Sequence, residues 1–309
     1  MLSIFTWCIS KEKDMNLCLI LLVALFTTCY SITNRTLVTM QVFSSRSNPQ
    51  WHLEGEERTN FLTIVKDLYK NYKNCDQKTY KLGYTGFRVV DSQNNKCLHV
   101  VNSKPAETFL LESYMRRNNG EEKLIEHIKD SIQSGIKTFH SPNPTFTPLV
   151  INPVRRVGPD NVTVYSPERW KGLEEGFNNC YNYASDVCTY HFSSPGLGSG
   201  KEFTVVSCED VWPASIRDGL VPLSNKTSPP FRNQPKLGHY VSLVIWPETD
   251  FHWYRKDLGG FWSHKPGNIE VRDVDASGNK IADPDKADIK PYTEICGYYI
   301  AIPSKLKLN

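Results

Sequence analysis

The stretch Gly238-His-Tyr-Val-Ser-Leu-Val-Ile-Trp-Pro-Glu-Thr-Asp-Phe-His-Trp-Tyr-Arg255 decides the fold of the C-terminal half of the chain. Residues 240–246 and 251–255 are rich in β-branched and aromatic side chains, which favour extended strands. Pro247 and the polar residues after it separate the two runs, as a tight turn does. The stretch therefore predicts two neighbouring strands joined by a turn, and residues 296–302 predict a further strand.

A helix is expected ahead of these strands, over residues 178–190. One helix followed by several strands is the order typical of an α+β domain. We therefore expect residues 162–309 to form an α+β domain.

Cys180 lies in Asn178-Asn-Cys-Tyr-Asn-Tyr-Ala184, where that helix would begin. The positive end of a helix dipole lowers the pKa of a thiol and favours the thiolate, which is the nucleophilic form. His239 follows a glycine and opens an apolar strand, where it can face the thiol and serve as a general base. His252 or Asp257 on the next strand is expected to orient His239, as the third member of a triad does.

This order of residues resembles that of papain-like cysteine hydrolases, and most of all their bacterial CHAP-type amidase branch. The resemblance covers residues 178–255. It implies a helix packed on an antiparallel sheet, with Cys180 as nucleophile, His239 as base and His252 as orienting residue. It also implies a peptide, a cell-wall crosslink or another amide as substrate, and no cofactor. A wider set of motifs, which adds Phe261-Trp-Ser-His-Lys-Pro-Gly267, resembles uncharacterised bacterial proteins and implies no activity.

Cysteine usage leaves a second interpretation open. Six cysteines follow residue 31, and an even number in a secreted chain usually means disulfides. They are Cys75, Cys97, Cys180, Cys188, Cys208 and Cys296. We expect Cys75 to pair with Cys97, since both lie in the N-terminal part. A bridge from Cys180 to Cys188 or Cys208 would remove the nucleophile. The chain would then be a non-enzymatic secreted protein: a binding protein, a toxin or an extracellular-matrix protein, a biomineral component among them.

The aromatic residues near the end of the stretch also allow two interpretations. Trp253, Trp262 and His264 combine large rings with polar groups, a mixture that can line a cleft for a sugar or a peptide. The same residues can form the core and turn of a hairpin around residues 257–260. The first interpretation adds a carbohydrate-binding module to the candidate functions.

The N-terminus predicts secretion. Residues 17–26 form an unbroken apolar run, preceded by Lys11 and Lys13. Small residues at Cys29 and Ser31 fit the −3 and −1 positions of a cleavage site. We expect residues 1–31 to be a signal peptide, and no later segment is long and apolar enough to span a membrane. Three N-glycosylation sequons follow, at Asn34, Asn161 and Asn225.

The remaining chain divides by composition. Residues 32–140 predict a smaller α+β region, with helices over 56–72 and 121–134 and short strands within 84–101. Residues 141–161 carry five prolines and predict a linker.

The net charge and the motifs argue against two classes of function, nucleic-acid binding and metal binding. The formal net charge of +3 over 309 residues is too small for a protein whose main partner is nucleic acid. No metal is expected, because no two of these six cysteines form a C-x-x-C pair and the calcium-loop pattern that begins at Asp273 fails at Lys280 and Pro284.

Overall fold

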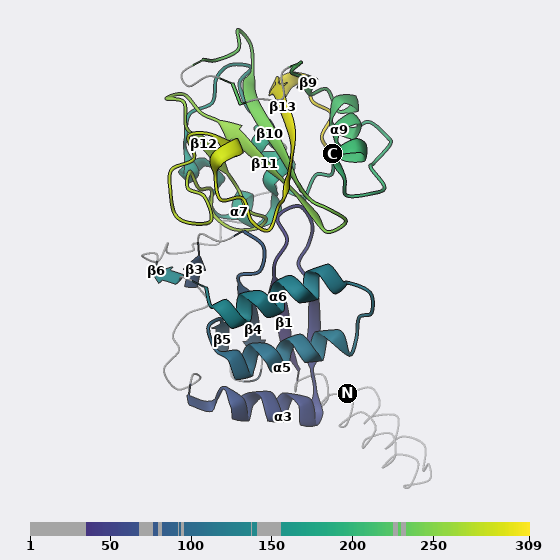
Figure 1. The fold of residues 1–309 in the computed structure, drawn as a ribbon, viewed down its shortest axis with the longest axis vertical. Coiled ribbons are helices and arrows are strands. Elements are labelled where there is room, and N and C mark those ends of the chain that lie inside the picture. Colours follow the sequence, from purple (N-terminus) through teal and green to yellow (C-terminus); the bar gives the residue numbers. More distant parts are fainter. Residues whose placement is uncertain are drawn as a thin grey trace, which may run out of the picture.

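The computed structural model describes residues 35–67, 77–79, 82–91, 93, 96–136, 138–140, 156–224, 228–229 and 233–309. The predicted signal peptide, residues 141–155 of the predicted linker, and the sequons at Asn34 and Asn225 lie outside these ranges. The described chain forms an N-terminal and a C-terminal lobe, each built from helices and antiparallel strands (Figure 1). The α+β class is therefore confirmed. Within these ranges no helix has the length and apolarity needed to cross a membrane.

The N-terminal lobe is a four-stranded antiparallel sheet with helices on one face (Figure 1). Its strands, in the order β2-β1-β4-β5, are Gln50–Leu53, Thr36–Gln41, Gly86–Asp91 and Lys96–Val100. Its helices are α3 Gly55–Ile64, α5 Lys104–Met115 and α6 Glu122–Ser134. A small two-stranded sheet beside it pairs β3 Gln77–Thr79 with β6 Thr138–His140.

The predicted helix over 121–134 is confirmed as α6, whose Leu124, Ile128 and Ile132 are buried. The helix predicted over 56–72 is confirmed as α3 up to Ile64, where Val65 interrupts helical geometry with a ψ of 9°. Lys66 and Asp67 are helical again, and residues 68–72 lie outside the described ranges. Helix α5 was not predicted, although Leu110, Leu111 and Tyr114 on its buried face follow helical spacing.

The C-terminal lobe contains a five-stranded antiparallel sheet. Its strands, in the order β12-β11-β10-β13-β9, are Trp262–His264, Asp250–Lys256, His239–Trp246, Glu294–Ala301 and Val221–Pro222. The other regular elements are α7 Leu173–Phe177, α8 Cys180–Ser185, α9 Cys208–Arg217, the pair β7 Arg156–Val157 and β8 Val187–Cys188, and the 3-10 helices Pro167–Trp170, Pro284–Lys286 and Pro303–Lys305. The hairpin predicted from the first stretch is thus confirmed as β10–β11.

Helix α8 is shorter than the helix predicted over 178–190. It has six residues and ends where Asp186 adopts a left-handed conformation with a φ of 51°. The next two residues already form β8, which pairs with β7. The sequence pattern does not predict that the helix ends here, because an aspartate is only one of several residues that tolerate the left-handed region.

The two faces of the C-terminal sheet bury different partners, because side chains alternate along a strand. Phe251 and Trp253 of β11 pack towards α8 and α9. Tyr254 of β11 and Trp246 of β10 face the other way and belong to a core that continues into the N-terminal lobe. The two lobes are therefore joined by buried apolar surface.

Candidate functional site

Cys180 is the first residue of α8, and its neighbours hold the start of this helix firmly. The side chain of Asn179 accepts hydrogen bonds from the backbone N–H groups of Tyr181 and Asn182, both at 3.1 Å. Asn182 returns a bond by accepting from the Asn179 backbone N–H at 3.0 Å. This reciprocal capping explains why the helix begins where the sequence predicts.

The thiol of Cys180 is free and has no exposed surface. Its Sγ lies 3.9 Å from the carbonyl oxygen of Phe251 in β11. Burial raises the pKa of Cys180 well above its usual value, and the nearby Asp250 carboxyl adds to this shift. The helix dipole was expected to lower this pKa, but a six-residue helix does not offset the loss of water around the thiol.

A loop of the N-terminal lobe covers this end of α8. Asn179 Nδ2 donates to the Ser45 carbonyl at 2.8 Å. Asp250 accepts the backbone N–H of Ser44 at 2.8 Å, the Ser45 hydroxyl, and the Tyr292 hydroxyl at 2.7 Å. Residues 42–45 are themselves buried. The two lobes therefore meet at the helix start that carries Cys180.

His239, the predicted base, lies at the other end of α8. Its Nε2 donates to the Ala184 carbonyl at 2.6 Å, and its Nδ1 is buried without a partner. Burial, together with the charge of Arg255, lowers the pKa of His239 to about 4. Among the described contacts of Cys180 and His239 there is none between the two side chains. The structure thus places the predicted nucleophile and base in different surroundings.

His252, the predicted orienting residue, projects from the opposite face of the sheet. Its Nε2 lies 2.8 Å from His264 Nδ1, and His264 Nε2 lies 3.0 Å from the Val274 carbonyl. Because a carbonyl only accepts, His264 donates through Nε2 and accepts from His252 at Nδ1. Burial lowers the pKa of His264 to about 3, and that of His252 well below its usual value. Both rings are neutral members of the core.

Asp257, the other predicted orienting residue, belongs to a buried network around Arg255. Arg255 Nε donates to Asp257 at 3.1 Å, and Nη2 donates to the Tyr183 hydroxyl at 2.8 Å. Ser263 Oγ lies 2.6 Å from Tyr183 and also donates to Asp257. The network closes on itself and leaves Asp257 no contact with His239.

The predicted ligand-binding aromatic residues are core residues. Trp253 and Trp262 have no exposed surface, and neither has His264. Trp262 and His264 lie in β12, which pairs with β11 across a turn closed by the Gly260 N–H donating to the Asp257 carbonyl at 3.0 Å. The hairpin interpretation therefore describes these residues. Asn161, by contrast, is exposed, as a glycosylation site requires.

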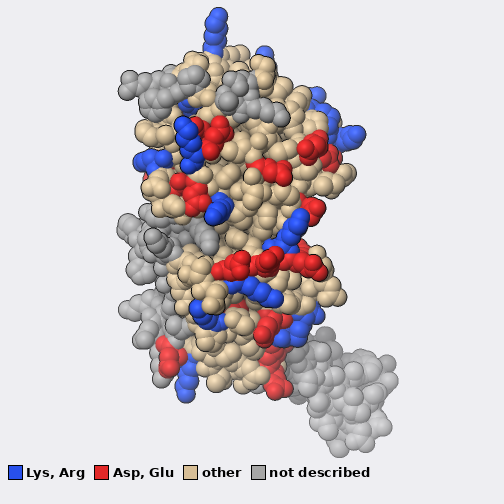
Figure 2. All heavy atoms as spheres, viewed as in Figure 1, with Lys and Arg blue, Asp and Glu red and all other residues tan. Residues whose placement is uncertain are grey.

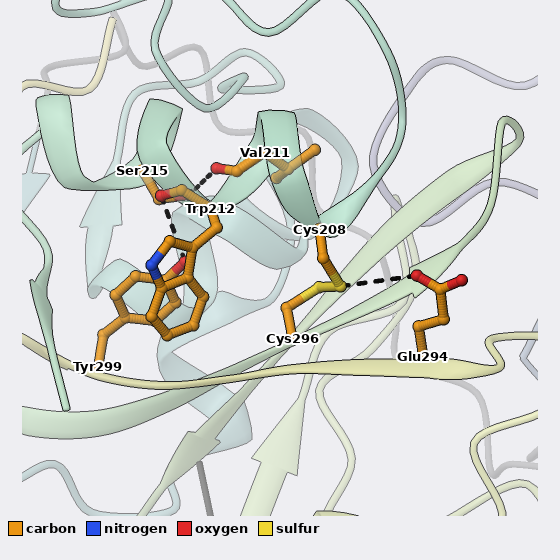
Figure 3. The surroundings of a disulfide bond; sticks show 7 residues. All are labelled: Cys208, Val211, Trp212, Ser215, Glu294, Cys296 and Tyr299. Carbon is orange, nitrogen blue, oxygen red and sulfur yellow. Dashed lines mark hydrogen bonds between the residues drawn. A yellow bond between two sulfur atoms is a disulfide. The ribbon is translucent and has the colours of Figure 1, made fainter. Parts of the chain in front are cut away.

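Some of the described cysteines form disulfides, as expected for a secreted protein. Cys208 and Cys296 form a disulfide that joins the start of α9 to β13 (Figure 3). This bond excludes the expected alternative of a Cys180–Cys208 bridge, and Cys188 is free and buried. Cys97 is disulfide-bonded, while Cys75, its predicted partner, lies outside the described residues.

Lys265 is a functional group that the sequence analysis did not single out. Its side chain is fully buried, and Nζ donates to the carbonyls of Glu175, Asn178 and Gly267 at 2.5, 2.7 and 2.6 Å. Burial lowers the pKa of Lys265 to about 7. No local sequence pattern predicts that Lys265 is buried and bonded in this way, because its partners are backbone carbonyls. In the described ranges no three acidic, histidine or cysteine side chains gather as metal ligands.

Comparison with known proteins gives one informative relative. Insoluble matrix shell protein 1 of Ruditapes philippinarum is 39% identical over 150 residues, which are 48% of this chain and 95% of that protein. No protein-family model and no solved structure matches the chain. The resemblance to papain-like hydrolases therefore stays a prediction.

Proposed function

The chain belongs to the family of insoluble matrix shell protein 1, and on that premise we propose that it is a structural protein of a mineralised extracellular matrix. The observation that carries this proposal is the coverage of the match, which spans 95% of the relative. The non-enzymatic alternative drawn from the cysteines is thus preferred over the hydrolase.

The protein is secreted and extracellular, as the sequence predicts. Its construction suits that compartment. The Cys208–Cys296 disulfide joins residues that lie 88 positions apart in the sequence, and such bonds persist in oxidising surroundings. The fully buried Lys265 donates to three backbone carbonyls, which favours a rigid, long-lived fold.

The charge distribution favours a role in the organic framework over direct binding of mineral. Acidic residues number 33 and basic residues 36, so the chain is not a polyanion. On the face in Figure 2, acidic and basic side chains are interspersed over both lobes. The segment that begins like a calcium loop is a closed turn, since Asp275 accepts the backbone N–H groups of Ser277 and Asn279 and Asp273 pairs with Lys280. Its carboxylates already have partners.

The hydrolase is the rival proposal, with Cys180, His239 and His252 as its residues. A free cysteine at a capped helix start supports it. Full burial of the thiol and the separate hydrogen-bond partners of the two histidines weigh against it. A general base must reach the proton that it abstracts. We therefore rank the structural role first.

The test is the location of the protein in the mineralised tissue of its source organism. The cleaned mineral is dissolved in a chelator, and the soluble and insoluble residues are digested separately and analysed by mass spectrometry. We expect peptides of this chain in the insoluble residue. An abundant cytosolic protein serves as the control for cell debris. Peptides found in secreted fluid but absent from the mineral would overturn the structural role.

A further inference from the structure

A hollow of about 280 Å³ opens on the C-terminal lobe beside the Cys208–Cys296 disulfide. Helix α9 supplies one wall, and the residues that follow β9 supply the other. The lining residues besides the disulfide are Glu209, Trp212, Pro213, Leu223 and Ser224. The hollow lies outside the region around Cys180, and the proposed matrix role does not use it.

Trp212 is exceptional among the tryptophans that the structure describes. Trp51, Trp170, Trp246, Trp253 and Trp262 are each at most 7% exposed. Trp212 is only partly buried and borders the hollow. A tryptophan left partly exposed at a surface hollow is a typical ligand contact.

The ring of Trp212 is fixed in place before any ligand arrives. It lies over Tyr299 with the ring centroids 4.0 Å apart (Figure 3). Gly297 allows this position, because a Cβ there would come within 2.7 Å of the indole. The disulfide ties the start of α9 to the strand that carries both residues. A platform held in this way loses little entropy on binding.

The chemistry of the hollow matches a sugar ring. A sugar ring has an apolar face of C–H groups and an edge of hydroxyls. The indole of Trp212 can stack on such a face, and the exposed Glu209 carboxylate and Ser224 hydroxyl can hydrogen-bond to such an edge. Pro213 and Leu223 add apolar contact around it. We propose that this hollow binds one sugar ring of a polysaccharide, with Trp212 as the stacking platform.

The test measures binding of soluble hexamers of β-1,4-linked N-acetylglucosamine and of β-1,4-linked glucose to the secreted protein by titration calorimetry. We expect saturable binding of at least one oligomer. Trp212→Ala should weaken it by about tenfold or more, since stacked aromatic residues dominate such contacts. Glu209→Gln should weaken it by roughly two- to tenfold through a poorer hydrogen bond. Phe261→Ala, at an exposed aromatic residue on the β11–β12 turn, should leave the affinity unchanged.

Circular dichroism of each variant checks that it folds. If Trp212→Ala does not fold, the comparison of Glu209→Gln with Phe261→Ala tests the proposal. Both residues are exposed, so we expect both variants to fold. The proposal is overturned if neither oligomer binds at millimolar concentration, or if every hollow variant that folds binds like the unchanged protein. A basic peptide is the competing occupant, because a cation can also contact an indole and a carboxylate. Binding of an oligolysine without binding of either sugar would establish that occupant instead.

Discussion

At the scale of single residues, burial decides the chemistry of Cys180. A thiol that has no exposed surface and a raised pKa is mostly protonated and shielded from reagents. We predict that iodoacetamide at neutral pH labels Cys180 at least roughly a hundredfold more slowly in the native protein than in denaturant, since labelling requires local opening. Mass spectrometry of the labelled peptides gives the two rates.

Cys188 is a matched control for this experiment, because it too is free and buried. It should be protected in the native state and labelled in denaturant. Fast labelling of Cys180 alone, lost in His239→Ala, would contradict the prediction and restore the hydrolase as the working function.

The buried histidines make stability depend on pH. The folded-state pKa is about 4 for His239 and about 3 for His264, and it is well below its usual value for His252. An unfolded histidine titrates near 6.5, so below that pH the unfolded chain binds more protons than the folded chain. We predict that the contribution of these histidines to the free energy of unfolding is fully present above about pH 6.5 and is lost as the pH falls from about 6.5 through their folded-state pKa values of about 4 and about 3. Urea unfolding at pH 7 and pH 5 measures the loss, up to about 1.4 kcal/mol per histidine per pH unit.

His191 provides the control, because its side chain is exposed. His191→Ala should keep the slope of stability against pH, whereas His264→Asn should reduce it, because it removes one titrating group. An unchanged slope in His264→Asn would show that the His252–His264 pair does not titrate on unfolding.

At the scale of elements, the sequence predicts the helices and strands whose composition or spacing is distinctive. Helix α6 could be predicted because its apolar residues follow helical spacing, and strands β10 and β11 because they are rich in β-branched and aromatic residues. The register between the strands could not be predicted from the sequence. It pairs His252 with Val244 of β10, away from His239 and on the other face, so proximity in the sequence suggested a triad that pairing does not form.

Asn179 shows how one side chain determines where an element begins. It caps α8 and also donates to the carbonyls of Ser45 and Ser193, both at 2.8 Å. We predict that Asn179→Ala lowers the free energy of unfolding by about 2–4 kcal/mol, since it removes a cap and leaves buried groups without partners. Chemical denaturation followed by circular dichroism measures this loss.

Asn118, which follows α5 and is exposed, is the control. Asn118→Ala should change stability by about 0.5 kcal/mol or less. A loss in Asn179→Ala as small as that would mean that water satisfies the freed groups and that the cap does not hold the two lobes together.

At the scale of the whole molecule, one buried core unites the lobes. Trp246 of β10 packs on His127 of α6, with ring centroids 4.9 Å apart, and both sheets contribute to the same apolar cluster. No motif in the sequence indicates this junction, because its apolar residues serve equally well in the core of either lobe. We therefore expect the two lobes to unfold together, in one transition seen alike by fluorescence and circular dichroism.

Asp250 is the polar centre of this junction, and its loss should separate the lobes. Its carboxylate accepts hydrogen bonds from Ser44, Ser45 and Tyr292. Asp250→Ala therefore leaves three buried donors without a partner. We predict a loss of about 2–4 kcal/mol and faster labelling of Cys180, because the covering loop loosens. Glu248→Ala removes an exposed ion pair with Lys123 across the same junction and should cost about 0.5 kcal/mol or less. Equal losses in the two variants would refute a junction held by buried hydrogen bonds. If Asp250→Ala loses more stability than Glu248→Ala but Cys180 is still protected from labelling, the C-terminal lobe alone shields the thiol.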